Sequence, residues 1–119
     1  MDKQRRKELA EQFKEIKVYM GVIKITNNVN GKIYITAYPN LKNRWLTLCM
    51  QLDTGRFANF DLQKDWTELG KDSFSYEVID QQEVKEEMDV HWEIKKLEKL
   101  WLEKLQPYGD KGYHKYPKE

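Results

Sequence analysis

The sequence of 119 residues contains one cysteine, three prolines and six glycines, and it has no long uninterrupted run of apolar residues. A lone Cys49 cannot form an internal disulfide, which favours a reducing compartment. Because no apolar run approaches the ~20 residues that cross a bilayer, we expect no membrane partner. The opening residues, MDKQRRKELAEQ, lack the apolar core of a secretory signal. These absences together predict a cytoplasmic protein.

The chain also lacks an excess of charge of either sign. Lysine and arginine number 21 and aspartate and glutamate 20, so the formal net charge is +1 although 34% of the residues are charged. This balance argues against a protein that holds nucleic acid mainly through bulk charge, but it leaves room for a local basic strip. Aromatic residues are well represented, with four Trp, four Phe and seven Tyr, and they supply bulk for the core of one domain.

Hydrophobic spacing predicts four helices and three short strands. Apolar residues recur at helical intervals over residues 3–20, 41–52, about 59–69 and about 90–105. β-branched or alternating residues predict strands over 22–26, 32–36 and 74–78, with a loop over 81–89 and an irregular tail. The order helix, hairpin, two helices, strand, helix predicts an α+β fold, in which helices pack on a small, mostly antiparallel sheet.

Local signals mark the ends of several predicted elements. Gly21 is expected to end the first helix. Asn30-Gly31 predicts a tight hairpin turn in which both residues adopt φ > 0. Asn59 is expected to cap the third helix, and Gly70 to follow its last turn.

One carboxylate falls on or beside an apolar helix stripe. In the last predicted helix, Glu98 lies only about 40° from Ile94 around the helix axis. A carboxylate removed from water must be paired, hydrogen-bonded or metal-bound. Two interpretations follow: Glu98 pairs with a nearby Lys or Arg, or it is a metal ligand or acid in a cleft. Arg44 beside an apolar stripe has the same two kinds of interpretation, an ordinary surface charge or a phosphate ligand. Glu98 and Arg44 with Tyr34 on the hairpin would suit phosphoryl chemistry.

Five segments, taken in order, resemble the GIY-YIG endonuclease superfamily. They are GVIKITNNVNGKIYIT, PNLKNRW, GRFANFDLQKDW, DSFSYEVID and LEKLWLEKLQPYGDKGYH, and together they cover about residues 21–114. The resemblance implies a three-stranded antiparallel sheet flanked by helices over residues 21–119. The helix predicted over 3–20 makes residues 1–20 an additional N-terminal helical extension. The resemblance also implies metal-dependent hydrolysis of DNA: an active domain would use Mg²⁺ or Mn²⁺ as its cofactor, and an inactive one would need none.

The resemblance assigns roles to individual residues. Tyr34, Arg44 and Glu98 correspond to catalytic positions: the second-arm tyrosine, the phosphate-binding arginine and the metal-binding glutamate. The hairpin frame is matched by Gly21, Asn30 and Gly31. The expected nucleic-acid contacts are made by Arg44 and Asn59, together with a basic rim of Lys42, Arg56, Lys64 and Lys71.

Several family positions carry a different residue in this chain. They are Ile23 for the first-arm tyrosine, Thr36 for the glycine of Tyr-Ile-Gly, Leu48 for a histidine or tyrosine, Phe57 for a histidine, and His114 for the closing asparagine. Ile23, Leu48 and Phe57 would make the expected cleft more apolar. Losing a positioned acid or base typically slows a reaction by ~10²–10⁴.

Three functions are therefore compatible with the sequence. The first is a nucleic-acid-binding domain, with DNA as the expected partner, whose phosphodiester cleavage is impaired or absent. The second is an active metal-dependent DNA endonuclease of reduced or altered mechanism. The third is a pseudo-nuclease that binds a protein partner through the apolar cleft and the N-terminal helix over residues 3–20.

Overall fold

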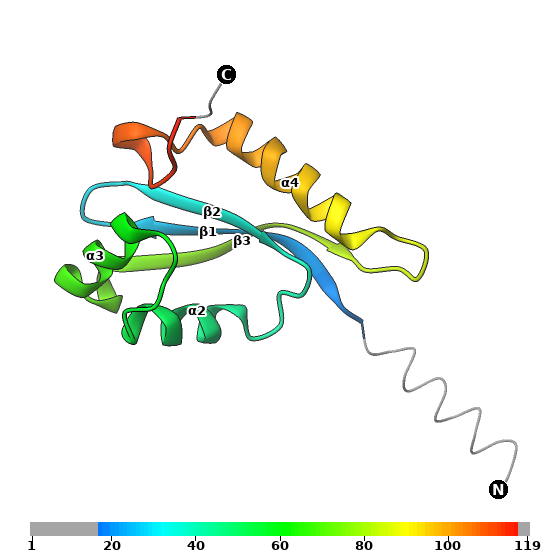
Figure 1. Ribbon diagram of the computed structural model, residues 1–119, viewed down its shortest axis with the longest axis horizontal. Helices are drawn as coiled ribbons and strands as arrows, with labels where there is room; N and C mark the ends of the chain where they lie inside the picture. The colour runs from blue at the N-terminus through cyan, green and yellow to red at the C-terminus, as the bar shows by residue number, and fades with distance from the viewer. Residues whose placement is uncertain (1–16, 117–119) are drawn as a thin grey trace, which may run out of the picture.

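The computed structural model, which describes residues 17–116, places a three-stranded antiparallel sheet between two layers of helices (Figure 1). The strands are β1 (Tyr19–Asn27), β2 (Ile33–Tyr38) and β3 (Phe74–Glu83), in the spatial order β2-β1-β3. The helices are α2 (Arg44–Asp53), α3 (Phe60–Leu69) and α4 (Val90–Leu105), with short 3₁₀ turns η1 (Lys71–Ser73) and η2 (Gly109–Lys111). The predicted α+β class and three-stranded antiparallel sheet are confirmed.

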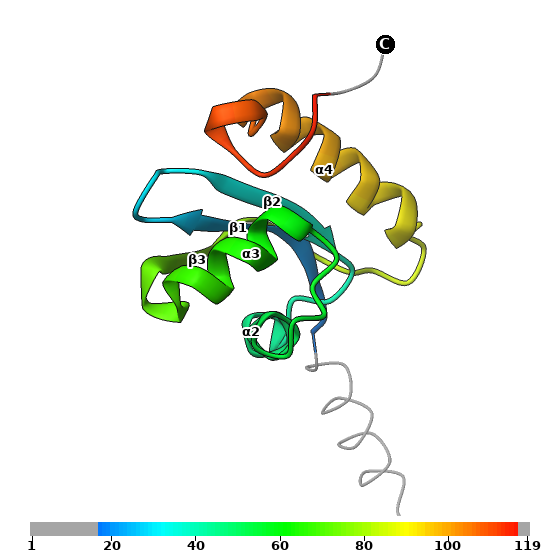
Figure 2. The same ribbon diagram turned by 60° about the vertical axis from the view of Figure 1, so that its left-hand side comes forward.

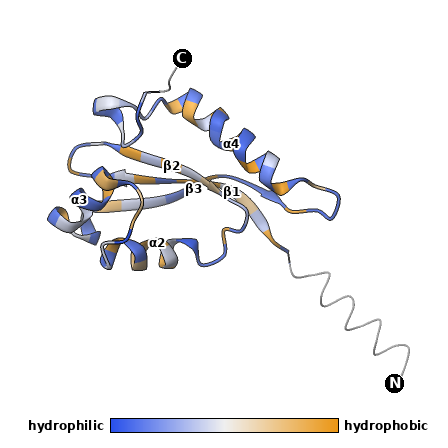
Figure 3. Cartoon of the chain, in the orientation of Figure 1, coloured by the Kyte–Doolittle hydropathy of each residue, from blue (hydrophilic) through white to orange (hydrophobic). Residues whose placement is uncertain are grey.

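The central strand β1 buries side chains on both faces of the sheet. Ile23 and Ile25 pack toward α2 and α3, whereas Val22 packs toward Leu97 of α4. Figures 1 and 2 show the same division, with α4 covering one face and α2 and α3 the other. In Figure 3, α4 carries both hydrophobic and hydrophilic residues, while the connection before it is largely hydrophilic. Alternation along the strands and the helical period in the helices therefore produce two cores, one on each side of the sheet.

The helix predicted over residues 3–20 extends into residues that the structure assigns to β1. Residues 1–16 lie outside the described part of the chain, but Tyr19 and Met20 open β1 and pair with Glu83 and Gln82. The prediction of a helix through Met20 is therefore wrong at residues 17–20. Met20 fits the helical spacing of the preceding apolar residues, yet it is fully buried as a strand residue. The proposed division between residues 1–20 and 21–119 stays a prediction.

Two further boundaries differ from the predictions. The predicted strand over 74–78 continues to Glu83, so the loop predicted over 81–89 is wrong for its first three residues. Gln81 and Gln82 pair with β1 on an edge strand, where exposed polar side chains give no alternating apolar pattern. The helix predicted from residue 41 begins at Arg44. Within residues 17–116, none of the helices is long and apolar enough to cross a membrane.

The hairpin turn is longer than the Asn30-Gly31 signal predicts. The Asn27 N–H donates to the Lys32 carbonyl at 2.8 Å, and the Gly31 N–H donates to the Asn27 carbonyl at 2.7 Å. Of the two turn residues only Gly31 has a positive φ, 79°, so the predicted positive φ at Asn30 is wrong. The Asn30 side chain instead accepts the Lys32 N–H at 2.9 Å. The loop closed by the bond between Asn27 and Lys32 therefore has four residues, 28–31, and uses one left-handed glycine.

Gly21 is required because the backbone of β3 lies close to its Cα. The pairing of the two strands is irregular between Val22 and Ile23. A Cβ atom at Gly21 would collide with the Asp80 carbonyl oxygen and would lie 2.9 Å from Gln81 Cα. Only glycine fits this contact, since the obstructing atoms belong to the backbone.

Gly21→Ala should therefore lower the free energy of unfolding by about 1–3 kcal/mol through overpacking. Gly31→Ala is the control, because nothing lies within 4 Å of a Cβ atom at that position. It should lower the free energy of unfolding by about 1 kcal/mol, since only its positive φ is unfavourable for alanine. Urea unfolding of both variants measures the difference. A Gly21→Ala protein as stable as wild type would contradict the close approach of β3.

Candidate functional site

The outer edge of β2 is covered by residues from the C-terminal third of the chain. The Ala37 N–H donates to Glu98 Oε2 at 3.2 Å, and the Ile35 N–H donates to His114 Nε2 at 3.0 Å. The Ile33 carbonyl accepts the Tyr113 N–H at 3.0 Å. An edge strand leaves such groups unpaired unless other segments reach them. α4 and the C-terminal segment therefore place Glu98 and His114 side by side along β2.

This geometry explains the position of Glu98 on its helix. In the described part of the chain the only ion pair joins Lys24 and Glu77, at 3.5 Å, so Glu98 has no cationic partner there. Its partner is the backbone N–H of Ala37, and a half-buried carboxylate is stabilised by that bond. Its second oxygen has no hydrogen-bond partner among residues 17–116. Glu98 therefore faces β2 with one oxygen fixed and one oxygen open.

Two tyrosines of β2 project from the sheet face that α2 and α3 cover. The Tyr34 ring stacks on His114, with ring centroids 5.0 Å apart, and meets Phe57 edge-on at 5.4 Å. Burial raises the pKa of Tyr34 to about 12, and the neighbouring phenol of Tyr38 and the carboxylate of Glu98 add to the shift because they oppose a second negative charge. At neutral pH Tyr34 is therefore a protonated phenol, which donates a hydrogen bond but does not act as a base.

Arg44 is held in place at the start of α2. Its guanidinium lies over the Tyr38 ring, with 4.0 Å between Cζ and the ring centroid. Its Nη2 and Nε atoms donate to the Asn40 carbonyl at 2.9 and 3.3 Å. Burial raises the pKa of Tyr38, while the positive charge of Arg44 opposes part of that shift and Glu98 adds to it. Tyr38 therefore lies within electrostatic reach of both charged residues.

The structure places Tyr38, a residue that sequence reasoning missed, against Arg44 and within the electrostatic influence of Glu98. The catalytic roles expected for Tyr34, Arg44 and Glu98 stay predictions. Tyr38 follows Tyr34 by four residues in β2, so the two side chains share a face of the sheet. This spacing of four residues along a strand could have indicated that Tyr38 lies on the same face as Tyr34. Thr36 lies between them on the same face, and its hydroxyl lowers the pKa of both phenols in part.

The expected apolar cleft is wrong for two of its three residues. Ile23 and Leu48 are 0% and 1% exposed and belong to the core between the sheet and α2 and α3. Only Phe57 is partly exposed, where it packs against that core and Tyr34. Apolar residues at these positions enlarge the core, since their side chains do not reach solvent. Two positions that the resemblance assigns to proton transfer therefore contribute to packing.

Asn59 serves the fold, and the elements that carry the basic rim lie across the sheet from α4. The Asn59 side chain accepts the Leu62 N–H at 3.1 Å, which confirms the predicted N-cap of α3, and it donates to the Tyr113 carbonyl at 3.0 Å. The predicted basic rim, Lys42, Arg56, Lys64 and Lys71, is exposed on the segments that carry α2, α3 and η1. These elements lie across the sheet from α4 (Figure 1), so a role for the rim stays a prediction.

A buried polar network anchors the segment that carries His114. Asn27 is fully buried and donates to the Tyr113 hydroxyl at 3.0 Å, and that hydroxyl donates to Asp65 Oδ2 at 2.7 Å. Burial and the bond to Asp65 raise the pKa of Tyr113. The network joins the hairpin turn, α3 and the C-terminal segment. No local pattern marked it, because its members are far apart in sequence.

Glu98 is the one predicted metal ligand. Over residues 17–116 no group of three or more His, Cys, Asp or Glu side chains could hold a metal ion. Mg²⁺ commonly keeps several waters and binds one or two carboxylates together with substrate phosphates. The open oxygen of Glu98 fits that mode of binding, in which a bound phosphate completes the coordination.

His114 should make stability depend on pH. Burial lowers the pKa of its imidazole, and the Ile35 N–H donates to an Nε2 atom that must be unprotonated to accept it. The unfolded chain therefore binds a proton that the folded chain does not, and the protein loses stability as the pH falls below about 6.5. We expect at most about 1.4 kcal/mol of loss per pH unit.

Urea unfolding at about pH 7.5 and about pH 5.5 measures this loss. His114→Asn is the matched control, because asparagine does not titrate in that range. The loss between the two pH values should shrink in the variant. An equal pH dependence in both proteins would show that His114 does not titrate as its environment implies.

Comparison with known proteins supports the fold. No protein-family model matches the chain, and no curated protein matches it. The structure is similar to the catalytic domain of the homing endonuclease I-TevI, with a TM-score of 0.63 and 20% identity over 79% of this chain and 95% of that one. It is also similar to a mutant of the catalytic domain of intron endonuclease I-TevI, with a TM-score of 0.65 and 20% identity over 81% of this chain and 92% of that one. In its sheet and three flanking helices, the chain has the fold of the GIY-YIG endonuclease superfamily.

Proposed function

We propose that the protein is a nucleic-acid-binding domain built on a nuclease fold, with DNA as its partner and with impaired or absent phosphodiester cleavage. The observation that carries this proposal is a contrast within one site. Arg44 is held on the Tyr38 ring, and the charge of Glu98 also acts on Tyr38, whereas Ile23 and Leu48 are buried in the core. Groups that would bind a phosphate are present, and groups that would move a proton are replaced.

Arg44 is suited to the binding step. A guanidinium presents a planar fork of donors that matches two phosphate oxygens. Its contacts with the Tyr38 ring and the Asn40 carbonyl fix it before a ligand arrives, which reduces the entropy lost on binding. Tyr34 and Tyr38 are protonated at neutral pH and would add neutral hydrogen-bond donors. The site would therefore stabilise a phosphate without carrying a large positive charge.

The catalytic step lacks a suitable base. Glu98 would hold a divalent cation, Mg²⁺ or Mn²⁺, which when bound polarises a phosphate and activates water. Tyr34 keeps its proton at neutral pH because its pKa is about 12. His114 could accept a proton at Nε2 only by losing the bond from Ile35. Hydrolysis should consequently be slow even when a phosphodiester is bound.

Tyr38 favours a second candidate function, a metal-dependent DNA endonuclease of reduced or altered mechanism. Its phenol shares a face with Tyr34 and lies near both Arg44 and Glu98, so it could donate a proton where Ile23 cannot. This function requires nicking that depends on Glu98. The third function, a protein-interaction module, depends on residues 3–20, of which 3–16 lie outside the described residues.

Equilibrium binding tests the main proposal. Fluorescence anisotropy with a DNA duplex of about 20 base pairs should show binding at low salt, and log K should fall with log [salt] by about 0.9 for each phosphate contacted. A poly-anionic competitor such as heparin, added at matched charge, controls for nonspecific attraction. No binding at low salt, or affinity that is flat as salt rises, would contradict the proposal.

A further inference from the structure

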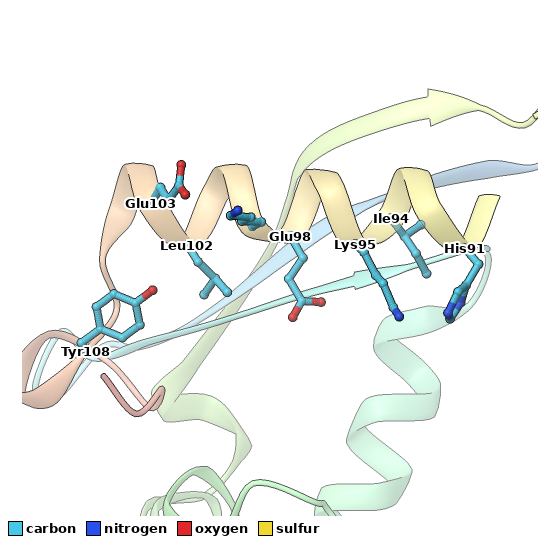
Figure 4. A pocket seen from close by; sticks show the side chains of 8 residues that line it. His91, Ile94, Lys95, Glu98, Leu102, Glu103 and Tyr108 are labelled. Carbon is cyan, nitrogen blue, oxygen red and sulfur yellow. The ribbon is translucent and has the colours of Figure 1, made fainter. Parts of the chain in front are cut away.

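A groove runs along α4 on the side where Glu98 reaches toward β2. Its volume is about 490 Å³. In Figure 4 the Glu98 side chain projects into the middle of this groove, with His91 toward one end of the helix and Tyr108 toward the other. The groove is thus continuous with the site described above, and any ligand in it would pass Glu98.

Two lysines of the groove have no acidic partner in the part of the chain that the structure describes. The four lysines of α4 are Lys95, Lys96, Lys99 and Lys104. Lys96 and Lys104 lie over the rings of Trp92 and Trp101, at 5.0 and 4.8 Å from the ring centroids. Lys95 and Lys99 line the groove, are exposed, and have no carboxylate within 4.0 Å in residues 17–116. Being four residues apart, they lie one turn apart on the same side of the helix.

The floor of the groove differs from its rim. Ile94 and Leu102 are half-buried and pack on the core beneath α4, and the half-buried ring of Tyr108 closes one end. A cationic rim over an apolar and aromatic floor suits one strand of nucleic acid, whose phosphates meet the lysines while sugars and bases meet the floor. The wall from His91 to Leu102 is roughly 16 Å long. Lys95 and Lys99 are about 6 Å apart along the helix axis, so each can meet a different phosphate of the same strand.

Two glutamates of the groove would repel the phosphates of a bound strand. Glu98 and Glu103 also line the groove, so with Lys95 and Lys99 its formal charge is zero. The groove would not attract polyanions indiscriminately. A divalent cation at Glu98 would remove one of the two repulsive charges, so strand binding and cation binding should support each other.

We propose that the α4 groove binds one strand of nucleic acid, with its phosphates on Lys95 and Lys99, and leads that strand past Glu98. This inference rests on the proposed nucleic-acid-binding function. It assigns the strand to the α4 side of the sheet, whereas the basic rim predicted from the sequence lies on the opposite side.

The test compares two pairs of substitutions on one helix. Lys95→Gln/Lys99→Gln removes the groove lysines, and Lys96→Gln/Lys104→Gln removes the same charge from the lysines that rest on tryptophans. Binding of a labelled single-stranded DNA of about 20 nucleotides is measured in Mg²⁺ by anisotropy, and melting temperatures confirm that both variants fold. The groove pair should weaken binding roughly tenfold at about 0.15 M salt and reduce the salt slope by about 1.4. The control pair should change affinity less than about threefold.

Equal losses in the two pairs would overturn the groove proposal. Arg44→Ala, tested alongside, separates its failure from failure of the proposed function. If wild type binds and Arg44→Ala weakens that binding while the groove pair matches its control, the groove is wrong and the function stands. If wild type binds neither the single strand nor the duplex, the proposed function and the groove both fail.

Discussion

Arg44→Ala is expected to weaken DNA binding about tenfold or more, because a hydrogen bond to a charged group contributes about 1.5–3 kcal/mol and each 1.4 kcal/mol is a factor of ten. Arg44 is the one guanidinium that the described structure holds against the tyrosines of β2, at 4.0 Å from the Tyr38 ring. Anisotropy with duplex DNA measures the change. Arg56→Ala is the matched control, since Arg56 is exposed in the connection between α2 and α3.

Substitutions at Tyr38 test how Arg44 is held. Tyr38→Phe keeps the ring beneath the guanidinium and should bind DNA nearly as wild type does, whereas Tyr38→Leu removes the ring and should weaken binding. Adding Tyr38→Leu to Arg44→Ala should cause no further loss, because both changes remove one interaction. Equal losses for Arg44→Ala and Arg56→Ala would indicate instead that the basic rim binds the DNA.

Trp66→Ala should cause the largest loss of stability, about 3–5 kcal/mol. Trp66 is 4% exposed, and its ring lies 5.2 Å from that of Phe74 and 5.8 Å from that of Trp45. Its indole N–H donates to Asp53 Oδ1 at 2.9 Å, which ties α3 to the end of α2. A domain of this size is stable by about 5–15 kcal/mol, so the variant should be partly or largely unfolded at moderate urea.

Trp92→Ala is the control for Trp66→Ala, because it makes the same substitution at an exposed tryptophan. Trp92 is 56% exposed on α4 and contacts Lys96, so its removal should cost about 1 kcal/mol or less. Urea denaturation followed by circular dichroism measures both variants. Similar losses at Trp66 and Trp92 would contradict the placement of the main core between the sheet and α2 and α3.

The fold was predictable where local chemistry and burial agree. Asn59 and Gly70 mark the ends of α3 as expected, and the apolar residues of β1 and β2 predict the two strands of the hairpin. Met20 was misassigned because a buried strand residue also fitted a helical interval. The end of β3 was missed because an exposed edge strand needs no apolar face.

The sequence singled out the residues of the candidate site but could not predict their contacts. Glu98 stood out as a carboxylate on an apolar stripe, yet its partner is a backbone N–H on β2, 61 residues away. The network of Asn27, Tyr113 and Asp65 likewise joins residues that are 86 and 48 positions apart in the sequence. Burial of Ile23 and Leu48 depends on the packing of α2 and α3, which their types alone do not specify. Such contacts follow from tertiary structure, which a single sequence does not encode locally.

The most direct test of binding without efficient cleavage is a plasmid-nicking measurement at protein concentrations that saturate the DNA. Wild type, Glu98→Ala and Ile23→Tyr/Leu48→His are compared in Mg²⁺ and in Mn²⁺, with melting temperatures to show that the double variant folds around its new polar core residues. We predict that wild type binds the plasmid fully yet nicks it within about tenfold of the Glu98→Ala background, since a positioned acid or base supplies about 10²–10⁴ in rate. Nicking by wild type more than about a hundredfold above Glu98→Ala would contradict this account and establish an active nuclease.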